Sequence, residues 1–238
     1  MAFTLNPGTL IVASAYPDPP FDIKDGSAGG FDIELMRAIC AQLGLTLQPE
    51  AYTGDDFNGI FEGLAKRTCD AVISGTTITP ERAAIMLFSE PYLEFNQGVA
   101  VNRQRTPSVS SVADLRGLIA GIQSGNTSDA VARRLKAEGI IADIKYYPYN
   151  GIVTALDDLE AGRIGLIIKL FPVISWLVKG RPQLSVPLQV PTHEKLGIAF
   201  AKDNRDLCDA VNRALRTLRV NGEFARLQAR WFPAPASP

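Results

Sequence analysis

Histidine and long apolar segments are scarce in this chain of 238 residues. Because His193 is the single histidine, a Ser-His-Asp catalytic arrangement and a metal site built from histidines are essentially excluded. No glycine-rich phosphate loop of the P-loop type is present. No apolar run approaches the roughly 20 residues that a membrane-spanning helix needs. We therefore expect neither a bound metal nor a cofactor.

Cysteine is also scarce. Cys40, Cys69 and Cys208 are an odd set without the CxxC spacing of a metal site, and Cys40 falls on the apolar face of an expected helix. We expect the cysteines to fill the core. The alternative is one disulfide with one free thiol.

Charge is nearly balanced, with 24 Lys and Arg against 25 Asp and Glu and a net charge of −1. Such a chain has no overall field that would attract nucleic acid or an anionic membrane surface. Residues 1–6 lack the basic and apolar segments of a secretory signal. Either a signal peptide has been removed or the chain is not exported.

Hydrophobic periodicity predicts alternating strands and helices. An apolar strand at 9–15 ends at a proline-rich segment, and apolar residues recur every four positions from Phe31 to Leu43 before Gly44. Further strands are expected at 45–51, 70–74, 118–123, 141–147, 164–169 and 196–201, and further helices at 57–66, 127–138, 150–161, 172–178 and near the C-terminal end. This alternation predicts two α/β units with a cleft between them, where ligands usually bind.

The segment 74–92 carries a family resemblance. Residues 74–82 read Ser-Gly-Thr-Thr-Ile-Thr-Pro-Glu-Arg and residues 88–92 read Phe-Ser-Glu-Pro-Tyr, which resembles the signature of bacterial extracellular solute-binding proteins of the polar amino-acid uptake class. The similarity continues in order at residues 30–35, 57–60, 111–117, 123–127, 161–163, 197–200 and 231–232. It implies two α/β lobes joined by two hinge strands, the periplasmic binding protein type II fold, with residues 1–96 and 195–238 in one lobe and 97–194 in the other.

The same resemblance implies a role in uptake. The chain would capture a small carboxylate-bearing solute by hinge closure and then dock on the membrane permease of an ABC transporter. We expect a monomer in the periplasm, or a lipid-anchored protein outside a cell with one membrane. The alternative is the ligand-binding sensor domain of a membrane receptor, which would share every binding residue.

Arg82 is the leading candidate for ligand binding. A buried carboxylate needs paired donors, and the planar guanidinium of Arg82 offers them after a turn rich in Gly and Thr. The alternative is a surface Arg at the start of a helix. The resemblance implies that Thr77 binds the same carboxylate and that the Gly75 carbonyl accepts a hydrogen bond from a ligand amine.

In the second lobe, Ser124, Asn126 and Thr127 lie between a strand and a helix N-terminus, where unpaired N–H groups favour an anion. The alternative is that Asn126 or Thr127 only caps the helix. The resemblance implies that Phe57 packs on the ligand, although a Phe before a helix is more often a core residue. Tyr16, after the first strand, is a further candidate.

The chain departs from the family pattern where relatives that bind α-amino acids place an Asp for the ligand ammonium. Leu170 occupies that position, and Ala15 falls near an early Asp that some members carry. An unpaired buried ammonium would cost several kcal/mol. Either the ligand has no α-amine, or Asp18 or Glu194 supplies the carboxylate.

Lys169 indicates a second anionic group on the ligand, since a lysine at the end of a buried apolar strand is unusual. The alternative is a lysine whose ammonium reaches the rim. With Arg82, Lys169 favours an amino acid, an acidic amino acid, a dicarboxylate or an opine-like ligand. Glu194 is the one candidate for the acid of a cyclohexadienyl dehydratase-like enzyme, and we expect no catalysis.

Overall fold

The computed structural model describes residues 4–24 and 28–233, and the chain divides into two units. Unit 1 comprises Met1–Tyr52, Ile60–Glu94 and Lys195–Pro238, and unit 2 comprises Thr53–Gly59 and Phe95–Glu194. The predicted boundaries placed residues 53–59, 95 and 96 in the first lobe. Backbone hydrogen bonds explain why 53–59 joins unit 2: the Phe57 N–H donates to the Ser124 carbonyl at 3.1 Å, and the Tyr149 N–H donates to the Asp55 carbonyl at 2.6 Å.

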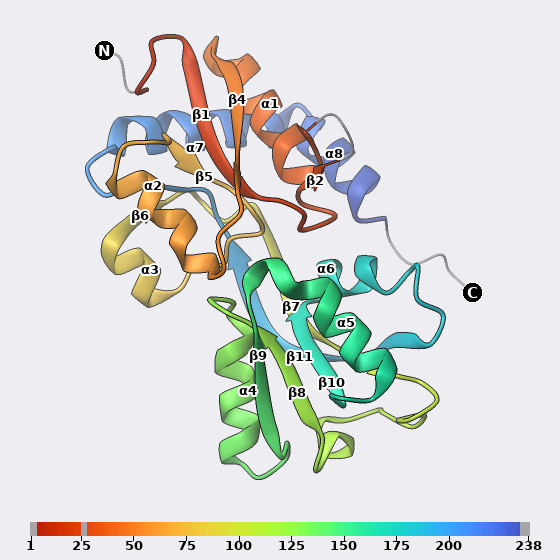
Figure 1. The fold of residues 1–238 in the computed structure, drawn as a ribbon. Helices are drawn as coiled ribbons and strands as arrows, with labels where there is room; N and C mark the ends of the chain where they lie inside the picture. Colours follow the sequence, from red (N-terminus) through yellow and green to blue (C-terminus); the bar gives the residue numbers. More distant parts are fainter. Residues whose placement is uncertain (1–3, 25–27, 234–238) are drawn as a thin grey trace. The chain divides into compact units, whose positions relative to one another are not determined.

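Unit 1 contains a five-stranded sheet in the order β4-β1-β5-β12-β6 (Figure 1). Its strands are β1 Thr9–Ala15, β4 Thr46–Tyr52, β5 Ala71–Val72, β6 Met86–Phe88 and β12 Ala199–Ala201, and a separate hairpin joins β2 Ile23–Lys24 to β3 Ala28–Gly29. Strand β1 is parallel to β4 and β5, whereas β12 is antiparallel to β5 and β6. The C-terminal part of the chain therefore returns to the sheet that the N-terminal part begins.

The helices of unit 1 follow the predicted apolar stripes. They are α1 Phe31–Leu43, α2 Glu62–Ala65, α3 Pro80–Ile85, α7 Arg205–Val220 and α8 Glu223–Trp231. In α1, Phe31, Leu35 and Ile39 are fully buried, and Gly44 ends the helix in the left-handed conformation with φ 66°. A 3₁₀-helix, η1 Phe57–Phe61, precedes α2 where one continuous helix was expected.

Unit 2 contains a second five-stranded sheet in the order β11-β7-β10-β8-β9. The strands are β7 Leu93–Asn102, β8 Ile119–Gln123, β9 Asp143–Tyr147, β10 Leu166–Leu170 and β11 Leu184–Leu196, and the helices are η2 Val112–Leu115, α4 Ser128–Ala137, η3 Tyr149–Gly151, α5 Ile152–Ala161 and α6 Phe171–Leu177. Strand β10 is antiparallel to β7 and parallel to β8. Strands β7 and β11 each cross a boundary between the two units.

Both faces of the second sheet are covered, which explains the continuous apolar run of β10. Val99, Val101 and Ile168 belong to a core cluster with residues of α4. Ala100 and Ile167, which alternate with them, belong to a second cluster with residues of α5. A strand buried on both faces reads as an unbroken apolar segment rather than an alternating one.

The cysteines are core residues, as predicted. Cys40, Cys69 and Cys208 are buried and free, and all three belong to unit 1. Burial raises the pKa of Cys40 and of Cys69 to about 11. Over residues 4–24 and 28–233, no helix combines the length and apolar character that crossing a membrane requires.

Candidate ligand-binding residues

Arg82 is buried in the first turn of α3, so the surface alternative is wrong. The Thr79 hydroxyl caps this helix by accepting from the Arg82 N–H at 3.3 Å. The side chain is 7% exposed, donates from Nη1 to the Thr77 carbonyl at 3.0 Å, and lies over the Phe61 ring at 5.0 Å from its centroid. These contacts orient the planar guanidinium, which is the group that binds a carboxylate through two parallel hydrogen bonds.

The loop before α3 is held in a shape that favours glycine at one position. Gly75 has φ 53°, and a Cβ there would lie 3.1 Å from the Phe21 ring. Its N–H donates to Asp32 Oδ2 at 2.7 Å. Thr77 is 7% exposed and forms an isolated bridge with Leu196. The loop thus brings

A buried pair of carboxylates supports this loop from behind. Asp22 and Asp32 are both fully buried. Asp22 accepts from the Ser74 hydroxyl at 2.5 Å, and Asp32 accepts from the Tyr92 hydroxyl at 3.1 Å in addition to the Gly75 N–H. Burial raises the pKa of Asp32 to about 7, and burial together with the charge of Asp32 holds the pKa of Asp22 well above its usual range.

Asp18 and Tyr16 lie beside this acid pair. The Asp18 N–H donates to the Asp22 carbonyl at 3.0 Å, and the charge of Asp18 contributes to the raised pKa of both Asp22 and Asp32. The Tyr16 hydroxyl is buried, and burial and the charge of Asp22 raise its pKa. No comparison tests a ligand role for either residue, so both stay predictions.

In unit 2, the turn after β8 presents Ser124, Asn126 and Thr127, but neither Asn126 nor Thr127 caps α4 through its side chain. Asn126 donates to Gln123 Oε1 at 3.4 Å, and Thr127 donates to Glu194 Oε2 at 2.7 Å. The capping alternative is therefore wrong. Ser124 donates to the Tyr147 carbonyl at 3.2 Å, which fixes the turn on the neighbouring strand.

Gly125 allows this turn to approach the segment around Phe57. It has φ 79°, and a Cβ there would lie 2.3 Å from Asp56 Oδ1 and 2.6 Å from the Phe57 N. Phe57 is 4% exposed and packs on Tyr149 with ring centroids 5.1 Å apart. Phe57 is thus a core residue of unit 2, and packing on a ligand stays a prediction.

Lys169 does not reach the rim, so that alternative is wrong. The residue is 5% exposed, and its ammonium lies over the Tyr149 ring at 5.5 Å from the centroid. Leu170, the next residue, is 8% exposed and ends β10. Tyr149 was missed from the sequence, although its place directly after a strand within Tyr147-Pro148-Tyr149 is a usable signal.

Glu194 faces the same unit because of a local irregularity in β11. His193 has φ 49°, and the N–H groups of Thr192 and His193 both donate to Asn96 Oδ1, at 3.1 and 3.2 Å. Glu194 then accepts from Gln97 Nε2 at 2.6 Å and from Thr127. Sequence reasoning missed Gln97, whose signal is an amide in an otherwise apolar strand.

A polar hollow of about 460 Å³ opens at the carboxyl end of β8. It is lined by Asp56, Asn58, Ser124, Gly125, Asn126, Asp129, Arg133 and Tyr146. Open α/β sheets bind ligands at the carboxyl ends of their parallel strands, and this is also where Ser124 and Asn126 were predicted to bind. Position and lining therefore agree with the predicted anion site.

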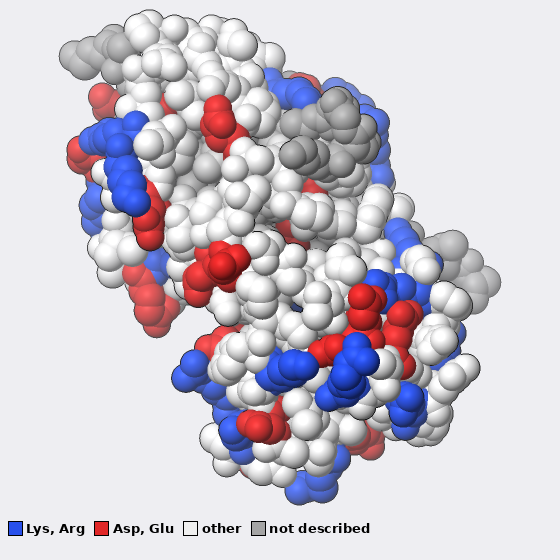
Figure 2. Space-filling view, viewed as in Figure 1, with Lys and Arg blue, Asp and Glu red and all other residues white. Residues whose placement is uncertain are grey.

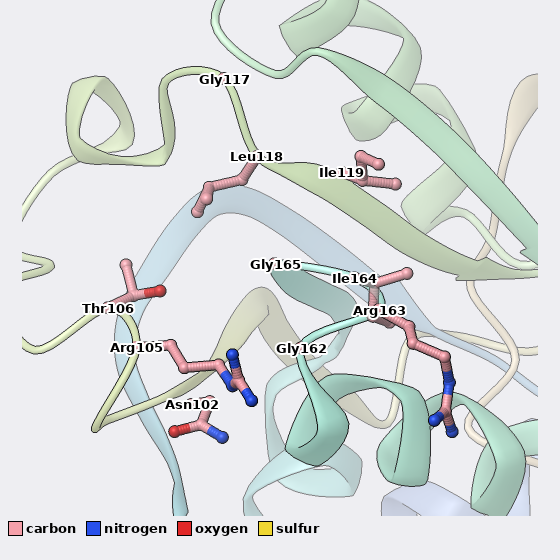
Figure 3. Close-up of a pocket in the computed structure, with 10 residues that line it drawn as sticks. All are labelled: Asn102, Arg105, Thr106, Gly117, Leu118, Ile119, Gly162, Arg163, Ile164 and Gly165. Atoms are coloured by element: carbon pink, nitrogen blue, oxygen red, sulfur yellow. The ribbon is translucent and has the colours of Figure 1, made fainter.

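A second hollow, of about 310 Å³, lies at the opposite end of the same sheet (Figure 3). Figure 3 shows Arg105 beneath the turn at Gly162, while the Arg163 side chain points away from Arg105. Gly117 and Leu118 precede β8, so this hollow is at the amino ends of the strands. None of the predicted binding residues lines it.

The surface and the acidic residues show no other site. On the face drawn in Figure 2, Lys and Arg side chains are interspersed with Asp and Glu side chains. The exposed ion pairs of unit 2 include Arg133 with Asp129 and Lys136 with Asp143. Over residues 4–24 and 28–233, no group of three or more His, Cys, Asp and Glu side chains is arranged to hold a metal ion.

Comparison with known proteins identifies the relatives of this chain. Residues 10–234 match the model of the bacterial extracellular solute-binding proteins, family 3. ABC transporter arginine-binding protein 1 of Escherichia coli (strain K12) is 32% identical over 230 residues, covering 93% of this chain and 89% of that protein. An ancestral arginine-binding protein bound to glutamine has a TM-score of 0.85 at 32% identity, covering 95% of this chain and 99% of that one.

A second solved structure bears on the question of catalysis. An ancestral amino acid-binding protein, described as a precursor of cyclohexadienyl dehydratase, has a TM-score of 0.83 at 29% identity and covers 94% of this chain and 96% of its own. Its printed description is that of a binding protein, although a dehydratase descends from it.

Two α/β units with these sheets, similar to such structures along nearly their whole length, define a solute-binding protein with the periplasmic binding protein type II fold. The chain belongs to the bacterial extracellular solute-binding proteins, family 3. It is a solute-binding protein and not an enzyme. The predicted family and fold class are confirmed.

Proposed function

We propose that this chain is the amino-acid-binding component of an ABC-type uptake transporter and that Arg82 binds the ligand's carboxylate. The buried guanidinium of Arg82, oriented by the Thr77 carbonyl and the Phe61 ring, is the observation that carries the proposal. A buried Arg that serves only structure would normally pair with a carboxylate of its own unit. The geometry suits a planar anion that arrives with the ligand.

The relatives support an amino acid as that ligand. One is named for arginine, and an ancestral arginine-binding protein was solved with glutamine bound. Lys169 distinguishes this chain, because a buried ammonium over the Tyr149 ring disfavours a cationic ligand side chain nearby. We therefore propose a ligand whose far end is acidic or neutral: an acidic amino acid, a related dicarboxylate or an opine-like conjugate.

Capture would involve both units. Strands β7 and β11 cross between them, and bending at these strands would let units 1 and 2 close on a ligand. The closed, monomeric form would dock on a membrane permease from the periplasm, or from outside a cell with one membrane. A decrease in the radius of gyration on adding ligand, measured by X-ray scattering, checks the closure.

Calorimetry and thermal shift against a defined panel test the function. The panel comprises L-arginine, L-glutamine, L-glutamate, 2-oxoglutarate and octopine. A ligand at 100 times its Kd stabilises the native state by about 2.7 kcal/mol, which a thermal shift detects. We expect L-glutamate or octopine to bind more tightly than L-arginine. Tighter binding of L-arginine would contradict the role given to Lys169, and no binding across the panel would overturn the proposed function.

Substitution of Arg82 tests the carboxylate site. We expect Arg82→Met to weaken binding of the best panel ligand by at least roughly 100-fold, and Arg82→Lys to weaken it by roughly tenfold because the charge remains and the fork is lost. Arg216→Met is the matched control in unit 1, since that side chain is 59% exposed in its pair with Glu90. Wild-type affinity in Arg82→Met would exclude Arg82 from the site.

A further inference from the structure

Glu194 is held in one orientation by two neutral donors from separate elements. Gln97 Nε2 donates to Oε1 at 2.6 Å and Thr127 Oγ1 donates to Oε2 at 2.7 Å. Gln97 Nε2 also donates to Thr127 Oγ1 at 3.2 Å, so the three side chains form one network. Glu194 is 8% exposed and Gln97 is 1% exposed. A carboxylate is thereby fixed on the sheet of unit 2.

The other end of the Gln97 amide is a buried acceptor without a donor. Within the described part of the chain, Gln97 Oε1 accepts no hydrogen bond. A buried acceptor left in this state costs about 1–3 kcal/mol, so a donor is expected in the working protein. Because the amide oxygen and nitrogen share one carbon, this oxygen lies beside the Glu194 carboxylate. An ionised acceptor and a neutral acceptor side by side match a cation with several N–H donors.

The register of the sheet places this pair on the same face as Leu170. Strand order runs β11-β7-β10, and Leu170 of β10 is paired directly with Gln97 of β7. Directly paired residues present their side chains to the same face of a sheet. The Glu194 carboxylate, which contacts the Gln97 side chain, therefore lies on the face where Leu170 offers no polar group.

We propose that Glu194 and Gln97 Oε1 bind the α-ammonium group of the ligand, with Thr127 as a positioning residue. This inference rests on the proposed function, in which Arg82 takes the carboxylate. It selects an amine-bearing ligand over an amine-free dicarboxylate, and it selects Glu194 over Asp18. Asp18 lies in unit 1 beside Asp22 and Asp32, where added positive charge would serve the acid pair.

Paired ligands that differ only in the amine test the site. The probes are L-glutamate with 2-hydroxyglutarate, and L-arginine with its 2-hydroxy analogue, titrated by calorimetry. In the wild type we expect the amine-bearing member of a bound pair to bind roughly 100-fold more tightly, and in Glu194→Gln we expect this preference to fall below roughly tenfold. Thr127→Val should reduce the preference and Thr127→Ser should keep it, since serine retains the hydroxyl.

Glu138→Gln is the matched control, because Glu138 ends α4 in the same unit with a side chain that is 51% exposed. Thermal unfolding of each variant confirms that it is folded, and Thr127→Val gives an independent reading if Glu194→Gln is unstable. An amine preference that is unchanged in both variants overturns this inference and leaves the proposed function intact. Absence of wild-type binding to every panel ligand overturns the proposed function, and this site with it.

Discussion

The two units bury aspartates in opposite ways. In unit 1, Asp22 and Asp32 are fully buried among neutral donors, and burial raises the pKa of both. In unit 2, Asp158 is 4% exposed, yet hydrogen bonds from Lys145, Tyr147 and Arg163 hold its pKa well below the usual range. Burial therefore does not decide the charge of a carboxylate. The neighbours decide it, because only a cation can replace the water that an ionised carboxylate loses.

The difference matters for the binding residues that each unit presents. The acid pair of unit 1 lies directly behind the Gly75 loop, so a neutral, protonated carboxylate there avoids a negative charge near the proposed carboxylate site at Arg82. Asp158 in unit 2 serves α5 and β9, and its charge is compensated locally. Unit 1 thus keeps its net positive group for a ligand, and unit 2 neutralises its structural charge before Glu194 is considered.

Removing the compensated charge should have the largest effect. Asp158→Asn leaves the Lys145 and Arg163 cations without their shared carboxylate, whose oxygens lie 2.6 Å from each. We expect the midpoint of thermal unfolding to fall by several degrees. The neighbouring Asp157→Asn is the control, because that side chain is 55% exposed and its loss should change the free energy of unfolding by no more than about 0.5 kcal/mol. Equal effects of the two substitutions would contradict the comparison.

The acid pair should make stability depend on pH in the neutral range. Because the native pKa of Asp32 is about 7, against about 3.9 in an unfolded chain, the native state keeps a proton that the unfolded state has lost. The stabilisation is full below about pH 4 and is lost as pH rises through 7. We expect the free energy of unfolding by urea to fall on the order of 2 kcal/mol between about pH 5 and pH 8.

Asp22→Asn should flatten this dependence, since it removes one carboxylate of the pair and the repulsion that raises the other. Asp114→Asn should not, because N–H groups of Ser110 and Ser111 lower the pKa of Asp114 to about 2 and it stays ionised throughout. A wild-type stability that rises over this pH range would show that the pair is ionised in the native state.

Thiol labelling should give the smallest effect and sharpen the comparison between units. Every cysteine of the sequence lies in unit 1, and burial raises the pKa of each thiol. We expect a thiol reagent at about pH 8 to react slowly with the native wild type and equally slowly with Asp158→Asn well below its unfolding midpoint. Faster labelling of the variant would mean that loss of Asp158 opens unit 1 as well.

Residues predicted from sequence share one property: their partners are close in the chain. Arg82 depends on Thr77 and Thr79, which lie within the same short motif. The α1 stripe and its end at Gly44 follow in the same way from local spacing. Gln97 was missed because its partners, Thr127 and Glu194, are 30 and 97 residues away.

The sequence by itself determined the two α/β units, the family and the loop that carries Arg82, because periodicity and short motifs encode local structure. Only the tertiary structure decided that Lys169 is buried, that Thr127 turns from its helix to Glu194, and that Gln97 joins them. Sheet order is the physical reason. It brings β11 beside β7 and β7 beside β10, and no local pattern in the chain specifies which strands become neighbours.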